Sequence, residues 1–183
     1  MFGPRSIVFV RHAQSIGNTM TQDERANHLT PNHAYPLTSV GVKQAAITAI
    51  YLRKNLSKDW PEIFFQSTFL RSQMTMDIIK TLPELPTSPV VLTDSRLDEK
   101  WDGIFHELSK KDIRESYHDQ VGLKKRSGYY HYRAPGGESC PDVELRIRSF
   151  LSDPLIAGKR ILVVGHGRWA ILFQKVLYGL TVE

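Results

Sequence analysis

Short apolar runs alternate with segments of helical periodicity along most of this chain. Such alternation indicates parallel strands joined by crossover helices. We therefore predict an α/β protein of three layers, α/β/α, around a mostly parallel central sheet. The predicted strands are residues 6–10, 62–66, 89–94 and 160–165, and the predicted helices are residues 38–56, 68–82, 139–151 and 168–179.

Apolar spacing predicts that the helix over 38–56 buries one face, with Thr38 or Ser39 as its N-cap. We expect Gly179 to end the last helix. The face of 38–56 that is predicted to be buried consists of Val42, Ala45, Ala46, Ala49, Ile50 and Leu52.

The composition is that of an ordinary globular protein. With 183 residues and 41% hydrophobic side chains, the chain is expected to form one domain over 1–183. Cys140 is the only cysteine, which excludes a disulfide within the chain and a zinc–cysteine cluster. The apolar runs are too short to cross a bilayer, and the N-terminus lacks a secretory pattern. We therefore expect a cytoplasmic protein and no membrane partner.

The formal net charge is +5 at pH 7. A positive charge suits nucleic acid or small phosphorylated substrates equally well. Because the basic residues are spread along the chain, with the densest cluster only KKR at 124–126, we expect no nucleic-acid partner.

Residues 102–137 break the alternation and are predicted to form an insertion over the active site. Within them, 124–126 is interpreted as a solvated face rather than a second phosphate site. The YYHYR stretch at 129–133 is either packing within the insertion or part of the substrate wall. The histidines expected to be solvated loop residues are His28, His33, His106, His118 and His131.

Reactive side chains follow three of the predicted strands. Arg11 and His12 come at the end of the first strand, and Arg71 lies in the first turns after the second. His166 stands between two glycines after the fourth. Because the carboxyl ends of parallel strands meet at one edge of the sheet, where α/β proteins bind ligands, we expect these four side chains to share a pocket.

Two arginines and two histidines suit phosphoryl transfer. Guanidinium groups match phosphate oxygens in bidentate fashion, and a neutral imidazole can attack phosphorus and divide the displacement into two steps. The leaving oxygen also needs an acid, and a carboxyl group beside a phosphate dianion can supply the proton. The candidates after the third strand are Asp98, Glu99 and Asp102.

Six blocks of the sequence resemble, in order, those of the histidine phosphatase superfamily. This family includes cofactor-dependent phosphoglycerate mutases and the bisphosphatase half of the fructose-2,6-bisphosphate enzymes. The blocks cover nearly the whole chain. They are RHAQSIGN (11–18), YPLTSVGVKQA (35–45), STFLRSQMT (67–75), RLDEKWDGIFHEL (96–108), PGGES (135–139) and VVGHG (163–167).

The resemblance implies a phosphoglycerate mutase-like fold and a role for each matching residue. His12 would be the nucleophile that becomes phosphohistidine, and Glu99 the general acid. Arg11, Arg71 and His166 would form the phosphate pocket. The substrate-binding residues that the resemblance implies are Ser15, Asn18, Gly167 through its backbone, and Lys110. The family needs no metal, and we expect no cofactor.

The resemblance favours a phosphatase over a mutase. Mutases usually carry a longer insertion before the Gly-Glu-Ser block, whereas the interval from Glu99 to Gly137 is short and lacks an adjacent arginine pair. The expected activity is hydrolysis of phosphomonoesters of small metabolites, with a phosphoprotein as the alternative substrate. Phosphoglycerate mutase-type transfer and a catalytically silent phosphate- or phosphoprotein-binding relative stay open. The sequence carries no indication of oligomeric state.

Overall fold

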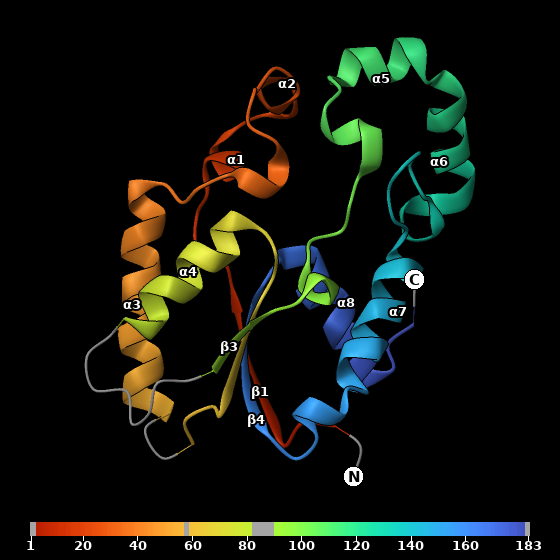
Figure 1. Cartoon of the computed structure of the whole chain (residues 1–183). Coiled ribbons are helices and arrows are strands. Elements are labelled where there is room, and N and C mark those ends of the chain that lie inside the picture. The colour runs from red at the N-terminus through yellow and green to blue at the C-terminus, as the bar shows by residue number, and fades with distance from the viewer. Residues whose placement is uncertain (1–2, 57–58, 82–89, 182–183) are drawn as a thin grey trace.

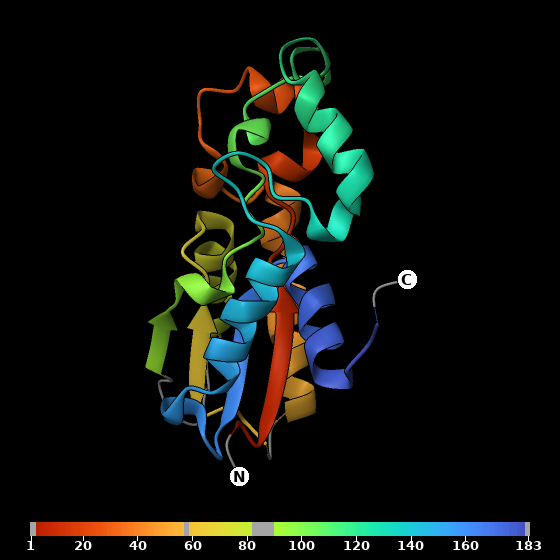
Figure 2. The ribbon, with the colours of Figure 1, turned by 90° about the vertical axis from the view of Figure 1, so that its right-hand side faces the viewer.

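Four parallel strands form the central sheet in the computed structural model, which describes residues 3–56, 59–81 and 90–181. The strands are β1 (Ser6–Arg11), β2 (Ile63–Gln66), β3 (Val90–Thr93) and β4 (Arg160–Gly165), in the spatial order β1-β4-β2-β3. All neighbours pair in parallel, so the carboxyl ends of the strands share one edge (Figure 2). The predicted α/β class is confirmed. Residue 89 of the third predicted strand and residue 82 of the second predicted helix lie outside the described residues.

Helices cover both faces of the sheet (Figure 1). The covering helices are α3 (Ser39–Leu56) and α4 (Leu70–Lys80) on one face, and α7 (Cys140–Leu151) and α8 (Gly167–Tyr178) on the other. Strand β4 joins the two layers: Ile161 and Val163 pack with side chains of α7 and α8, whereas Leu162 and Val164 pack with those of α3 and α4. All four are fully buried, which contributes roughly 1.5–3 kcal/mol each.

Helix α3 begins as predicted and buries part of the predicted face, namely Ala45, Ala49 and Leu52. The Gly41 amide donates to Thr38 Oγ1 at 3.0 Å, so Thr38 caps the helix. The side chains of Val42 and Ile50 are exposed, so the prediction that they face the core is wrong. The stripe that faces the core is Gly41, Ala45, Ala49 and Leu52. Small residues at four-residue spacing let α3 approach its neighbours closely, and that approach turns the adjacent stripe toward solvent.

The helices on the opposite face have defined ends. Ser139 caps α7 through a capping box with Asp142. Helix α8 ends at Gly179, whose φ of 62° lies in the left-handed region, as the sequence predicted. None of the helices in the described ranges is both long and apolar enough to cross a bilayer.

Further helices lie beyond the carboxyl edge of the sheet (Figure 1). They are α1 (Ile16–Thr19), α2 (Gln22–Ala26), α5 (Lys110–Ser116) and α6 (His118–His131), with a kink in α6 at Gly128. The short 3₁₀ helices are η1 (Asn32–Ala34), η2 (Ser95–Leu97), η3 (Gly103–His106) and η4 (Pro154–Ile156). The Lys110 amide donates to Asp23 at 3.1 Å, and Gln22 Nε2 donates to the Leu108 carbonyl at 3.2 Å, so the segment before α5 is tied to α2.

The start of α3 holds the loop that follows β1. The Gln14 amide donates to Gln44 Oε1 at 3.0 Å, and the Gln14 carbonyl accepts from the Thr38 amide at 3.0 Å. A Cβ atom at Gly41 would lie only 2.0 Å from that carbonyl oxygen. The absence of a side chain at Gly41 therefore lets α3 press directly on the loop that carries His12.

We expect Gly41→Ala to destabilise the fold by about 1–3 kcal/mol, because backbone must move to admit the methyl group. Gly122→Ala is the matched control: its Cβ would meet only the end of the Arg126 side chain, at 3.4 Å. In α6 that change should be neutral or stabilising, by up to about 1 kcal/mol. Urea unfolding of both variants measures the difference, and equal stabilities would contradict the close approach.

Candidate active site

The carboxyl edge of the sheet opens into a cavity of about 220 Å³, the inner cavity. The sequence-predicted site residues in its wall are Arg11, His12, Ser15, Asn18, Arg71 and Glu99. His166 lies beside His12, with ring centroids 5.1 Å apart, but is fully buried and is not among the described lining residues. Lys110 lines a neighbouring cavity instead.

The ring of His12 is fixed by two hydrogen bonds. Its Nδ1 lies 2.8 Å from the Ala13 carbonyl oxygen. Because a carbonyl oxygen can only accept, Nδ1 carries the ring proton. Arg71 Nε donates to His12 Nε2 at 3.2 Å, which is consistent with the same tautomer. The lone pair of His12 is therefore at Nε2.

His12 is held in its neutral form. Burial, together with smaller effects of the Arg71 and Arg11 charges, lowers the pKa of the His12 imidazole from 6.5 to about 4. Desolvation is the largest cause of this shift. At neutral pH the ring is free of the proton that would block attack by Nε2.

His166 is a second neutral imidazole. Its Nε2 lies 2.7 Å from Ser67 Oγ, and its ring packs edge-on against Phe69 at 4.9 Å between centroids. Burial and the nearby Arg71 charge hold the pKa of His166 well below its usual value. The His166 Nδ1 atom is buried and has no hydrogen-bond partner among the described residues. An unpaired buried polar atom beside His12 marks a place for a ligand atom.

The two arginines differ in how firmly they are held. Arg71 is buried, donates to the Asn32 carbonyl at 2.8 Å, and lies over the Phe69 ring at 4.6 Å. Burial lowers the pKa of Arg71 to about 10, so its guanidinium is still charged at neutral pH. Arg11 is exposed, and a Cβ at Gly167 would lie 3.5 Å from its Nε atom. That distance is an ordinary van der Waals contact, so a methyl group at Gly167 would touch Arg11 without displacing it.

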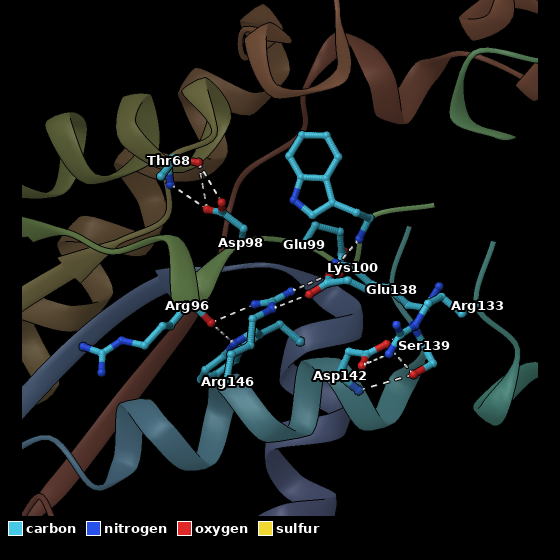
Figure 3. A network of polar contacts seen from close by, with 12 residues as sticks. Thr68, Arg96, Asp98, Glu99, Lys100, Arg133, Glu138, Ser139, Asp142 and Arg146 are labelled. Carbon is cyan, nitrogen blue, oxygen red and sulfur yellow. Dashed lines mark hydrogen bonds and ion pairs between the residues drawn. The ribbon is translucent and has the colours of Figure 1, made fainter. Parts of the chain in front are cut away.

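The three candidate acids have different partners. Asp98 accepts from the amide and hydroxyl of Thr68 at 2.8–2.9 Å and points away from Glu99 (Figure 3). Asp102 accepts two bonds from Arg168, at 2.7 and 2.8 Å, which outweigh the effect of burial and lower its pKa. Glu99 accepts only from backbone amides and has no ion-pair partner among the described residues. Of the three, Glu99 is the carboxylate best placed for proton transfer in the inner cavity.

A half-buried network supports the segment that carries Glu99. Glu138 accepts from Arg146 at 2.9 and 3.1 Å and from the Trp101 amide at 3.0 Å (Figure 3). Arg146 also donates to the Arg96 carbonyl at 2.7 Å. Glu138 directly precedes Ser139, the N-cap residue of α7. It fastens residues 96–101 to α7.

Ser15 and Asn18 shape the backbone at the cavity. The Ser15 amide and hydroxyl both donate to Asn18 Oδ1, at 2.9 and 3.0 Å. Ser15 is thereby bound within the turn that starts α1, while both residues also line the cavity. Their proposed substrate contacts stay predictions.

Sequence reasoning missed several lining residues. Lys100 is buried directly after Glu99, and Arg168 follows the second histidine block. His106 was predicted to be solvated, which is wrong: its Nε2 atom is buried without a partner, and burial lowers its pKa. The only sequence signal for Lys100 was its position directly after a candidate acid. His106 is buried because η3 folds back toward Tyr35. The sequence around His106 carries no sign of this contact, because Tyr35 is distant along the chain.

Within the described ranges, no group of three or more His, Cys, Asp or Glu side chains is arranged to hold a metal ion. The site is therefore built from imidazole, guanidinium, ammonium and carboxylate groups around one small cavity. Such a set binds an anion and offers both a nucleophile and a proton donor.

Known proteins resemble this chain in sequence and in fold. The chain is 33% identical over 186 residues to a 2,3-bisphosphoglycerate-dependent phosphoglycerate mutase of Beijerinckia indica, covering 98% of this chain and 84% of the relative. Its fold matches a putative alpha-ribazole-5'-P phosphatase from Escherichia coli with a TM-score of 0.72 and 21% identity, over 96% of this chain and 80% of that one.

A mycobacterial glucosyl-3-phosphoglycerate phosphatase in complex with VO3 matches with a TM-score of 0.67 and 25% identity, over 96% of this chain and 83% of that one. The family model of the histidine phosphatase superfamily, branch 1, matches residues 7–183. The chain therefore belongs to the histidine phosphatase superfamily.

Proposed function

We propose that this protein is a metal-independent phosphomonoester hydrolase that works through a phosphohistidine on His12. The observation that carries the proposal is the fixed tautomer of His12, with its lone pair on Nε2 at a cavity lined by arginines. A neutral nucleophile surrounded by positive charge suits attack on a phosphate dianion. The enzymes of this superfamily named above, phosphatases and a mutase, support the same phosphoryl chemistry.

In the first step, the Nε2 lone pair of His12 forms a bond to phosphorus and the bond from phosphorus to the ester oxygen breaks. Protonated Glu99 gives its proton to that oxygen, and the alcohol leaves. In the second step, Glu99 takes a proton from water while the water oxygen attacks phosphorus. The N–P bond breaks, inorganic phosphate is released, and Glu99 is again protonated.

The positive groups stabilise the charge on the transferring phosphoryl group. In the described structure, Arg71 donates to Nε2, so a bound phosphoryl oxygen must take over this donor before attack. Arg11 and the unpaired Nδ1 of His166 supply further partners for phosphoryl oxygens. Asn18 and the Gly167 amide complete the proposed phosphate contacts.

A phosphoglycerate mutase activity is the second candidate, because the relative at 33% identity has that name. The two activities differ in the acceptor of the phosphoryl group on His12. A phosphatase transfers it to water, whereas a mutase retains it until a phosphoglycerate accepts it. Quantifying inorganic phosphate against isomerised phosphoglycerate in one reaction separates them, and isomerisation without phosphate release would favour the mutase.

We expect His12→Ala to lower the release of phosphate from 4-nitrophenyl phosphate at least a hundredfold, with a chelator present. The control is His118→Ala, which removes an exposed histidine at the start of α6. If folded wild type is inactive but binds vanadate, the silent relative replaces the hydrolase. If His12→Ala keeps wild-type activity, the phosphohistidine is excluded.

The His12 imidazole should stay neutral down to about pH 4 in the folded protein, whereas an unfolded histidine titrates near 6.5. As pH falls through this window the unfolded chain binds the proton first, so folding stability decreases toward acid. NMR titration of the His12 ring, folded and in urea, measures both midpoints. A folded midpoint near 6.5 would contradict the effect of burial.

Glu99→Gln should lower kcat/KM for an alkyl phosphate about 10²–10⁴-fold, because an alkoxide leaves poorly without a proton and kcat/KM reports only the steps up to departure of the alcohol. The loss of kcat/KM for 4-nitrophenyl phosphate should be much smaller, since nitrophenolate leaves without protonation. Asp102→Asn is the control, because it removes the neighbouring carboxylate. Any decrease in activity that it causes should be similar for the two esters. Equal losses on both esters in Glu99→Gln would assign the acid elsewhere.

A further inference from the structure

A second cavity, the outer cavity, adjoins the inner one. It measures about 430 Å³, within the usual range for small-molecule sites. Arg25, Lys100, Asp102, His106 and Arg168 line both cavities. An ester whose phosphoryl group reaches His12 can therefore extend its alcohol part past this shared wall into the outer cavity.

The outer cavity has a surplus of positive charge. Its described lining contains six cationic side chains and one carboxylate, Asp102. That carboxylate is already bound by Arg168 at 2.7 Å and by Lys100 at 3.4 Å. Arg114 and Lys124, from α5 and α6, have no carboxylate partner among the described residues. A mobile anion entering from solution would be attracted to them.

The wall beneath these charges is aromatic and apolar. The Lys124 ammonium lies 5.7 Å from the Tyr132 ring centroid and 6.0 Å from that of Tyr129. Lys100 and Arg168 also lie over Tyr129, at 5.9 and 6.0 Å. Phe105 stacks parallel to Tyr132 at 6.5 Å. The cavity thus combines ring faces for a flat or apolar body with cations for an anionic end.

We infer that the outer cavity selects phosphomonoesters whose alcohol part has an apolar or ring-shaped body and ends in a second anionic group, bound by Lys124 and Arg114. The inference deepens the proposed hydrolysis at His12 and rests on it. Under this inference Lys124 belongs to a substrate site, whereas Lys125 and Arg126 are not among the residues that line the cavity. In the YYHYR stretch, Tyr129 and Tyr132 form substrate wall.

The first experiment compares two esters that differ only in the far group: 4-(phosphonooxymethyl)benzoate and 4-methylbenzyl phosphate. We expect kcat/KM for the carboxylate to be about tenfold or more higher, the usual effect of a hydrogen bond to a charged group. The advantage should shrink as ionic strength rises. A bis-phosphate of the same ring shows whether a carboxylate or a second phosphate is preferred.

The second experiment changes the cation. Lys124→Gln should reduce the ratio of kcat/KM between the carboxylate and neutral esters about tenfold, and Arg114→Gln should reduce it too. Lys125→Gln, on the same helix and exposed, should leave the ratio and both rates unchanged. Equal rates for both esters in wild type, or a ratio unaffected by Lys124→Gln, would overturn the inference while leaving hydrolysis at His12 intact.

A binding measurement keeps the two proposals separate if neither ester is hydrolysed. The probes are 4-(phosphonomethyl)benzoate and 4-methylbenzylphosphonate, which cannot turn over, and calorimetry gives their affinities. Tighter binding of the carboxylate, lost in Lys124→Gln, would support the outer anion site even though hydrolysis had failed. Equal affinities would overturn it.

Discussion

The hydrogen bond between His12 Nδ1 and the Ala13 carbonyl is the contact on which the chemistry of this site depends. It is possible only because the backbone after β1 is held in place. The His12 amide donates to the Gly165 carbonyl at 2.9 Å, and the Ala13 amide donates to Thr75 Oγ1 at 3.1 Å. Strand β4 and helix α4 thus fix the loop from one side, while the start of α3 presses on it through Gly41. The tautomer of His12, the proposed nucleophile, is a consequence of sheet pairing and helix packing.

Burial and charge act together at this site. Two adjacent imidazoles are kept neutral mainly by desolvation, while the buried guanidinium of Arg71 stays charged. The buried cation of Arg71 and the unpaired Nδ1 of His166 are groups whose burial a phosphate dianion would compensate. Binding of a dianion would therefore stabilise the fold, as any ligand specific for the native state does.

Strand periodicity and the rule that parallel strands share a carboxyl edge were enough to predict the sheet, its covering helices and the meeting of His12, Arg71 and His166. What the sequence could not predict depends on contacts between distant segments. The pairing of Asp102 with Arg168, which leaves Glu99 as the unpaired carboxylate, joins residues 66 positions apart. The buried stripe of α3 was misassigned because alanine and glycine, rather than the larger Val42 and Ile50, face the close neighbour.

The shared wall links recognition to catalysis. Asp102 binds Lys100 and Arg168, both of which lie over the Tyr129 ring in the outer cavity. The backbone amide of Arg168 also lies 3.4 Å from Glu99 Oε2. A ligand that displaces Arg168 from Tyr129 therefore acts on the residue whose amide contacts the proposed general acid. Because α8 begins at Gly167, directly beside Arg168, the position of Glu99 is tied to the start of a helix that packs on the sheet. In the proposed hydrolase, a change in how the alcohol part contacts the shared wall would thus reach the residue that protonates the leaving oxygen.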